Sequence, residues 1–177
     1  MRTDYEIKKN SLNFDLNIFK YKQKNTTFLA FYIIIRKNIY TFMYSSNIID
    51  MEALFANCRS LTKILGLERF DTSKVVNMAG MFFNCNNLTE ILGLENFSTS
   101  KVEKMTEMFS NCSSLRNLNL SSFDTSNVID MSYMFAGCTN LTTIYVGDNW
   151  DLSNVEDTVN MFGGYGTSTT TLKGSNS

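Results

Sequence analysis

Apolar and polar positions repeat along this chain with a period of 26 or 27 residues from residue 43 onward. The period is marked most clearly by four cysteines: Cys58, Cys85, Cys112 and Cys138. A phenylalanine stands three residues before each of them: Phe55, Phe82, Phe109 and Phe135. Methionine or leucine comes directly before each phenylalanine, and leucine follows each cysteine by three residues. Such self-similarity indicates stacked units, each of which buries its apolar face against its neighbours.

Each unit is predicted to contain one short helix and one short strand. Apolar residues of the fourth unit are separated by three, three, one and three positions, as on one face of a helix: Val128, Met131, Met134, Phe135 and Cys138. The Thr-Ser-Asn segment at residues 125–127 contains residue types that cap helix starts. Residues 118–120 alternate apolar, polar, apolar, which is typical of a strand with one buried face. The pattern therefore predicts an α/β solenoid.

The N-terminal segment differs from the repeats. Residues 1–40 contain eight Lys or Arg against three Asp or Glu, although the whole chain has a formal net charge of −1. An apolar run at residues 28–35 is too short to cross a hydrocarbon core of about 30 Å as a helix. It also fits a signal peptide poorly, because Arg36 and Lys37 follow it at once. We expect it to form a strand, with residues 39–44 as the second strand of a capping β-hairpin; a degraded export signal is the alternative.

These patterns divide the chain into three segments. Residues 1–42 are predicted to be a basic N-terminal segment and cap, and residues 43–165 the repeat array. Residues 166–177 consist mostly of Gly, Ser and Thr, which predicts a flexible tail.

The repeat units resemble a known family. The unit Met105-x-x-Met108-Phe109-x-x-Cys112-x-x-Leu115-x-x-Leu118-x-Leu120, continued by the Phe-Asp-Thr-Ser-Asn-Val of residues 123–128, resembles the BspA-type leucine-rich-repeat surface proteins of bacteria. The resemblance implies a leucine-rich-repeat-like solenoid of about four repeats. It also implies an exported cell-surface or secreted protein engaged in adhesion or host interaction, with a protein partner. A cytoplasmic protein-interaction or assembly module of the same fold is the alternative.

Composition removes several classes of function. A chain without His cannot supply a Ser-His-Asp triad, a Cys-His pair or a His-ligated metal on its own. The nearly neutral charge argues against nucleic acid as a partner. Carboxylates are scattered among the repeats, so we expect a non-enzymatic protein without cofactors; a carboxylate-dependent enzyme such as a glycosidase is the third class.

The cysteine and phenylalanine positions are expected to be structural columns. With helices in each unit, neighbouring thiols would lie at about 8–10 Å, beyond the Cα separation of ~7 Å that a disulfide permits. We therefore expect four buried, reduced thiols; one or more disulfides are the alternative. No CxxC pair is present, and we expect the recurring Asp-Thr-Ser segments to make turns rather than to bind metal.

A binding face is expected on the outward positions of the strands, which should align across repeats. The residues are Lys63, Leu65, Glu90, Leu92, Asn117, Asn119, Thr143 and Tyr145. Leu65 and Leu92 could instead turn inward, because the segment Ile64-Leu65-Gly66-Leu67 has one residue more than the equivalent segment Leu118-Asn119-Leu120.

Overall fold

The computed structural model describes residues 15–23, 26–35, 38–44, 48–163 and 171–174. The strands within these ranges are β1 (Asp15–Gln23), β2 (Thr26–Ile35), β3 (Asn38–Tyr44), β4 (Lys63–Leu65), β5 (Glu90–Ile91), β6 (Asn117–Leu120), β7 (Thr143–Val146) and β8 (Thr171–Gly174). Two short 3-10 helices follow β4 and β5: η1 (Leu67–Arg69) and η2 (Leu94–Asn96).

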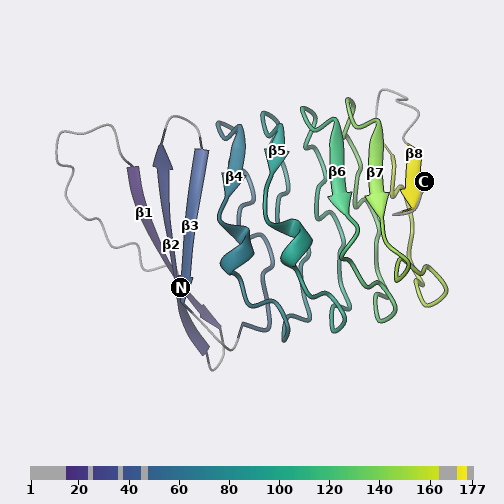
Figure 1. Ribbon diagram of the computed structural model, residues 1–177, viewed down its shortest axis with the longest axis horizontal. Helices are drawn as coiled ribbons and strands as arrows, with labels where there is room; N and C mark the ends of the chain where they lie inside the picture. The colour runs from purple at the N-terminus through teal and green to yellow at the C-terminus, as the bar shows by residue number, and fades with distance from the viewer. Residues whose placement is uncertain (1–14, 24–25, 36–37, 45–47, 164–170, 175–177) are drawn as a thin grey trace.

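Each repeat contributes one short strand to a parallel arrangement that we call the strand wall, β3 to β8 (Figure 1). β3 pairs in parallel with β4 and β4 with β5, while β6, β7 and β8 form a second parallel sheet. The two sheets part where the repeat shortens from 27 to 26 residues. In the third repeat Leu120 is buried as the last residue of β6, whereas the two repeats before it use a glycine and a 3-10 helix to bury Leu67 and Leu94.

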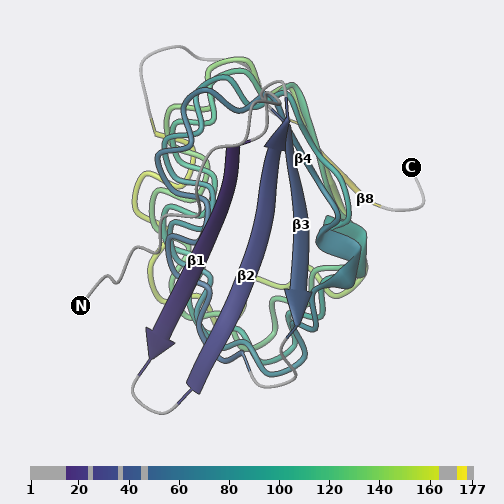
Figure 2. The same cartoon turned by 90° about the vertical axis from the view of Figure 1, so that its left-hand side faces the viewer.

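The N-terminal strands form an antiparallel meander at one end of the molecule. β1 pairs with β2, and β2 with β3, with Ile35 opposite Asn38 at the turn. Figure 2 shows β1 and β2 lying across the end of the stack, with β3 in line with the strand wall. The sequence analysis did not foresee β1. Residues 1–14 of the expected basic cap lie outside the described residues.

The opposite side of each repeat is not a helix, contrary to the sequence prediction. Residues 50–57, 77–84, 104–111, 130–137 and 157–163 form runs of consecutive tight turns, which we call the turn wall. In the second repeat, Met81 and Phe83 donate to the carbonyls three residues back, at Met78 and Gly80. Alternating with them, Met78, Gly80, Phe82 and Asn84 donate to the next repeat, at Lys104, Thr106, Met108 and Ser110 over 2.8–2.9 Å. No helix among the described residues is long and apolar enough to pass through a bilayer.

Backbone conformation explains why the helix prediction was wrong. Two positions in each of the first four turn segments have positive φ, for example Gly80 at 58° and Asn84 at 61°. A right-handed helix cannot continue through such residues, whereas glycine and asparagine adopt this conformation readily. A helix of this length would also be marginal, because nucleation is costly. Hydrogen bonds between repeats replace those within a helix.

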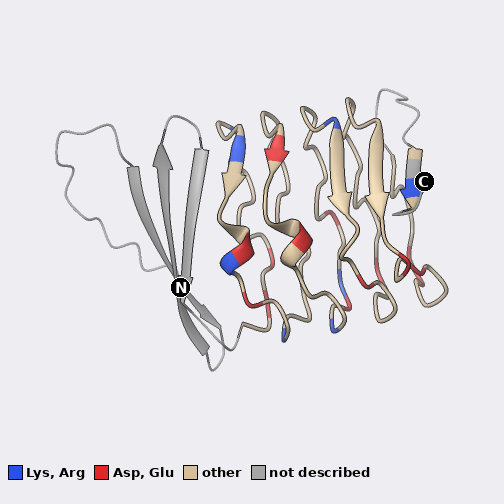
Figure 3. Cartoon of the chain, viewed as in Figure 1, with Lys and Arg blue, Asp and Glu red and all other residues tan. Residues whose placement is uncertain are grey.

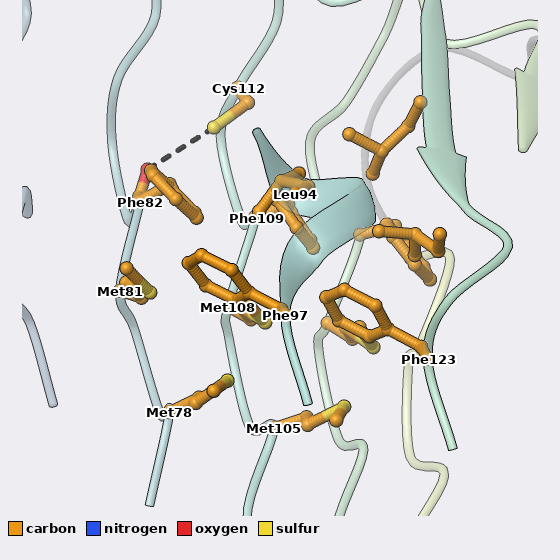
Figure 4. Close-up of a cluster of buried hydrophobic side chains, with 14 of the residues drawn as sticks. Met78, Met81, Phe82, Leu94, Phe97, Met105, Met108, Phe109, Cys112 and Phe123 are labelled. Atoms are coloured by element: carbon orange, nitrogen blue, oxygen red, sulfur yellow. Dashed lines mark hydrogen bonds between the residues drawn. The ribbon is translucent and has the colours of Figure 1, made fainter. Parts of the chain in front are cut away.

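The buried positions nevertheless follow the predicted periodicity. Val75, Met78, Met81, Phe82 and Cys85 have 0% exposure. Figure 4 shows Met78, Met81 and Phe82 within the cluster of buried side chains. The phenylalanines stack from repeat to repeat, with ring centroids 5.3–5.8 Å apart from Phe55 to Phe162. Adjacent repeats therefore lie at about the distance between neighbouring strands of a sheet, which is shorter than the distance between packed helices. The separation of 8–10 Å that was expected for neighbouring cysteines is wrong for the same reason.

The predicted helix caps have a different role. Thr72, Thr99 and Thr125 are buried, with 0–2% exposure. The Thr99 hydroxyl donates to the Asp124 carbonyl at 2.9 Å and accepts from the Asp124 N–H at 2.8 Å. Thr72 and Thr125 bind residues 98 and 151 in the same way. Each threonine therefore joins its own repeat to the next one.

The expected flexible tail contains an ordered strand. Residues 171–174 form β8, whose Leu172 aligns with Ile144 of β7. This segment supplies the strand of the fifth repeat, so the Gly/Ser/Thr composition was misleading there. The rest of the predicted tail, residues 166–170 and 175–177, lies outside the described residues.

Candidate interaction surface

The eight candidate binding residues lie on the strand wall in two rows. The first row contains Lys63, Glu90, Asn117 and Thr143, and the second contains Leu65, Leu92, Asn119 and Tyr145. The pairing register places Lys63 opposite Glu90, Asn117 opposite Thr143, and Asn119 opposite Tyr145. Because side chains alternate along a strand, Leu118 and Ile144 between these positions point into the core.

The N-terminal half of this surface combines an ion pair with leucines. Lys63 Nζ lies 2.5 Å from Glu90 Oε2, and both side chains remain at least 40% exposed. An exposed pair of this kind contributes at most about 1 kcal/mol to stability. Leu92 is 44% exposed and Leu65 half-buried. Leu92 therefore faces outward, because the glycine that follows, Gly93, has φ of 97° and turns the chain so that Leu94 is buried instead.

In the C-terminal half of the surface, β6 and β7 contain no charged residue (Figure 3). Asn117 and Asn119 are exposed, and Tyr145 has 39% of its surface accessible. The register places Lys173 of β8 directly beside Tyr145. Lys173 was missed because its segment was taken for a tail, although Thr-Leu-Lys repeats the polar-apolar-polar pattern of residues 143–145.

A groove lies on the turn wall, where no site was expected from the sequence. It is open, has a volume of about 720 Å³ and runs along the second to fifth repeats, lined by Phe83, Glu107, Tyr133 and Asn160 among others. Tyr133 is 40% exposed and has φ of 57°. Tyr133 stands where the second repeat has Gly80, and a large side chain with positive φ is unusual, but only the structure shows this φ.

The four cysteines form the column that their spacing suggested, and all four are free thiols. Cys85, Cys112 and Cys138 are buried, and each Sγ donates to the phenylalanine carbonyl of the preceding repeat at 3.0–3.2 Å. Figure 4 shows this bond between Cys112 and Phe82. Burial raises the pKa of Cys138 to about 12 and that of Cys112 further. Cys58 is only half-buried.

The Asp-Thr-Ser segments form local turns. Asp124 Oδ1 accepts from the N–H and the hydroxyl of Ser126, at 3.0 and 2.6 Å. Asp71 and Asp151 bind Ser73 and Ser153 in the same manner. These hydrogen bonds hold the pKa of all three carboxyl groups below the ordinary value of 3.8. Among the described residues, no three His, Cys, Asp or Glu side chains gather as a metal centre requires.

Comparison with known proteins assigns the chain to a family without an assigned activity. No match is found among curated proteins or among solved structures. One family matches over two overlapping ranges, residues 18–147 and 49–174, which end one 27-residue period apart. Together these ranges cover most of the 177 residues. The chain therefore belongs to the family described as "Mycoplasma protein of unknown function, DUF285".

Proposed function

We propose that this protein is a non-enzymatic protein-interaction scaffold whose strand wall binds a protein partner. In this proposal the fold is a leucine-rich-repeat-like solenoid of the BspA type, acting at the bacterial cell surface in adhesion or host interaction. The repeat motif of residues 105–128 supports the assignment, because it resembles the unit of that type and some ten of its positions agree from repeat to repeat.

The observation that carries the proposal is the alignment of exposed residues across three paired strands. Asn119, Tyr145 and Lys173 occupy adjacent positions on β6, β7 and β8 and all are exposed. An aromatic ring beside amide and ammonium groups can provide apolar contact together with hydrogen bonds, a combination that interface cores use. The short strands leave this surface open along the stack, as in other repeat proteins that bind partners on an extended face.

Tyr145→Ala tests the binding surface, with Tyr133→Ala as its matched control. The two tyrosines are 39% and 40% exposed but lie on opposite walls. Beads coated with each variant would be tested for adhesion to cultured animal cells, before and after protease removal of the cells' surface proteins. We expect Tyr145→Ala to weaken protease-sensitive adhesion by about 30-fold, the effect of losing an aromatic anchor of ~2 kcal/mol. Equal loss in both variants, or loss only in Tyr133→Ala, would move the site away from the strand wall.

The alternative is an intracellular protein-interaction or assembly module of the same fold. Labelling intact bacteria with a membrane-impermeant amine reagent separates the two. Modification of Lys173, which is exposed, in intact cells supports the surface location. Modification only after lysis supports the intracellular module, and the strand wall would then be tested against cytoplasmic proteins.

A further inference from the structure

Cys58 differs from the other thiols of the column in exposure and in hydrogen bonding. Cys85 and Cys112 have no exposed surface and Cys138 has 7%, whereas Cys58 is half-buried. The three later thiols each donate to a phenylalanine carbonyl one repeat earlier. Cys58 stands in the first repeat of this series, and its thiol interacts with the Cys85 thiol of the second repeat. A reagent in solution therefore reaches the column at Cys58.

The backbone on both sides of Cys58 is fixed to the second repeat. Asn57 N–H donates to the Phe83 carbonyl at 2.7 Å, and Asn87 Nδ2 donates to the Arg59 carbonyl at 2.7 Å. Cys58 and Cys85 therefore occupy equivalent positions on adjacent repeats at the sheet spacing of about 4.8 Å. This separation lies within the Cα distance of about 4.4–6.8 Å that disulfides use. The distance argument against a disulfide, which assumed helices, no longer applies.

Cys58 also differs from Cys85, Cys112 and Cys138 in the direction of its pKa shift. The side-chain interaction with Cys85 lowers the pKa of Cys58, although burial opposes this effect. The same contact with Cys58, together with burial, raises the pKa of Cys85. Since the thiolate is the nucleophile in disulfide exchange, Cys58 is the thiol of the column that attacks first. Cys85 needs no access to solvent, because its target is the sulfur that it already contacts.

We propose that Cys58 and Cys85 are a modification site, at which a small-molecule disulfide oxidises the pair to an intramolecular disulfide. The Cys58 thiolate attacks one sulfur of the small disulfide, whose S–S bond breaks and releases one small thiolate. Cys85 then attacks the Cys58 sulfur and displaces the second small thiolate, which takes up the Cys85 proton. Two protein thiols are oxidised and the small disulfide is reduced to two thiols. The product links the first repeat covalently to the second.

The test treats the full chain with oxidised glutathione and maps the product by mass spectrometry. We expect the intact mass to fall by two hydrogen atoms, one peptide pair to be linked through Cys58 and Cys85, and two thiols to remain titratable in denaturant. A reductant should restore all four. Unchanged mass, glutathione held on Cys58 as the final product, or a link through Cys112 would each overturn the proposal.

Variants test the order of the two steps. Cys85→Ser should stop the reaction at a glutathione adduct on Cys58, whereas Cys58→Ser should leave Cys85 unmodified. Cys138→Ser is the matched control, since it removes a thiol of the same column outside the pair and should leave the link unchanged. Modification of Cys85 in the Cys58→Ser protein would contradict the assigned order. Mapping of the native chain needs no variant, so the proposal remains testable if a substitution prevents folding.

Discussion

At the scale of single residues, the close spacing of the repeats makes some glycines irreplaceable and leaves others tolerant. Gly93 has φ of 97°, and a Cβ there would lie 2.5 Å from the Glu68 backbone nitrogen in the neighbouring repeat. Gly80 has φ of 58°, but a Cβ there would meet nothing nearer than 3.6 Å. Ala53 adopts φ of 55° at the equivalent position of the first repeat, so the fold already accommodates alanine there.

Gly93→Ala should therefore destabilise the protein by about 2–4 kcal/mol, because backbone strain and a clash with fixed backbone add together. Gly80→Ala should cost only about 1 kcal/mol, the strain of an alanine with positive φ. Urea unfolding of the two variants beside the native chain measures both effects. Equal costs would show that the backbone near Glu68 moves to accept the extra methyl group.

The buried threonines are a second case in which one side chain joins two repeats. Thr99→Val keeps the size of the side chain but leaves both backbone groups of Asp124 without their partner. We expect a loss of about 2–3 kcal/mol in the free energy of unfolding, since each unsatisfied buried polar group costs about 1–3 kcal/mol. Ser100→Ala, one position away on the exposed surface, should change stability by at most ~0.5 kcal/mol. A Thr99→Val protein as stable as this control would mean that water replaces the hydroxyl.

At the scale of elements, the aspartate turns make stability depend on acidity. The folded-state pKa values of Asp71, Asp124 and Asp151 are depressed, so their contribution is present above the ordinary value of 3.8. This contribution is lost as pH falls through the folded-state pKa values, because a protonated carboxyl group accepts these hydrogen bonds less well than a carboxylate does. Asp71 and Asp151 are exposed and Asp124 is half-buried, so solvent screening keeps each effect small.

We expect the urea midpoint to be level between pH 7 and 5 and to fall below about pH 4. Asp124→Asn keeps an acceptor for the Ser126 N–H without a titrating charge. Its midpoint should therefore decline less steeply than that of the native chain over the same range. A native midpoint that rises on acidification would contradict the assigned direction of the pKa shifts.

The elements also show where sequence reasoning succeeds and where it fails. Burial at Met78, Phe82 and Cys85 could be read from spacing, because stacked units must place their apolar residues in columns. The type of element could not, since the same steps of three and four residues fit both a helix and a run of tight turns. Positive φ at Glu107 and Tyr133 carries no signal in residue type, unlike that at Gly80 or Asn84.

The candidate surface was predictable in position but not in extent. Alternation located Asn119 and Tyr145 on the strand wall, because strands expose every second residue. Lys173 was missed because its neighbours in the sequence are mostly Gly, Ser and Thr. The groove near Tyr133 was missed because the conformation of the turns decides which side chains line it. Whether the Leu92 side chain faces inward or outward depends on the φ angle of Gly93, which cannot be read from the sequence.

At the scale of the whole molecule, each interior repeat contacts only its neighbours, so stability should grow with repeat number. Inserting a second copy of residues 78–104 after Lys104 adds one more junction of the kind that joins the second and third repeats. That junction has four turn-wall hydrogen bonds and one stacked phenylalanine pair. We expect a higher urea midpoint and a steeper transition, because more surface is buried in one cooperative unit. An insert with the same residues in scrambled order is the control and should lower the midpoint.

The turn wall also gives the stack of repeats a net dipole moment along its axis. Beyond the first residue of each segment, its hydrogen bonds between repeats run one way, from N–H groups of one repeat to carbonyls of the next, as from Met78 to Lys104. The first residue of a segment donates in the opposite direction, as Lys104 does to Val76. Peptide dipoles aligned in this manner add, as they do along a helix, and leave partial positive charge at the end where N–H groups remain. That end is the fifth repeat, where the N–H groups of Thr158, Asn160 and Phe162 have no acceptor within the described part of the chain. Residues 148–163 contain four acidic residues and no basic ones, so their charge compensates the dipole as acidic residues do in the first turn of a helix.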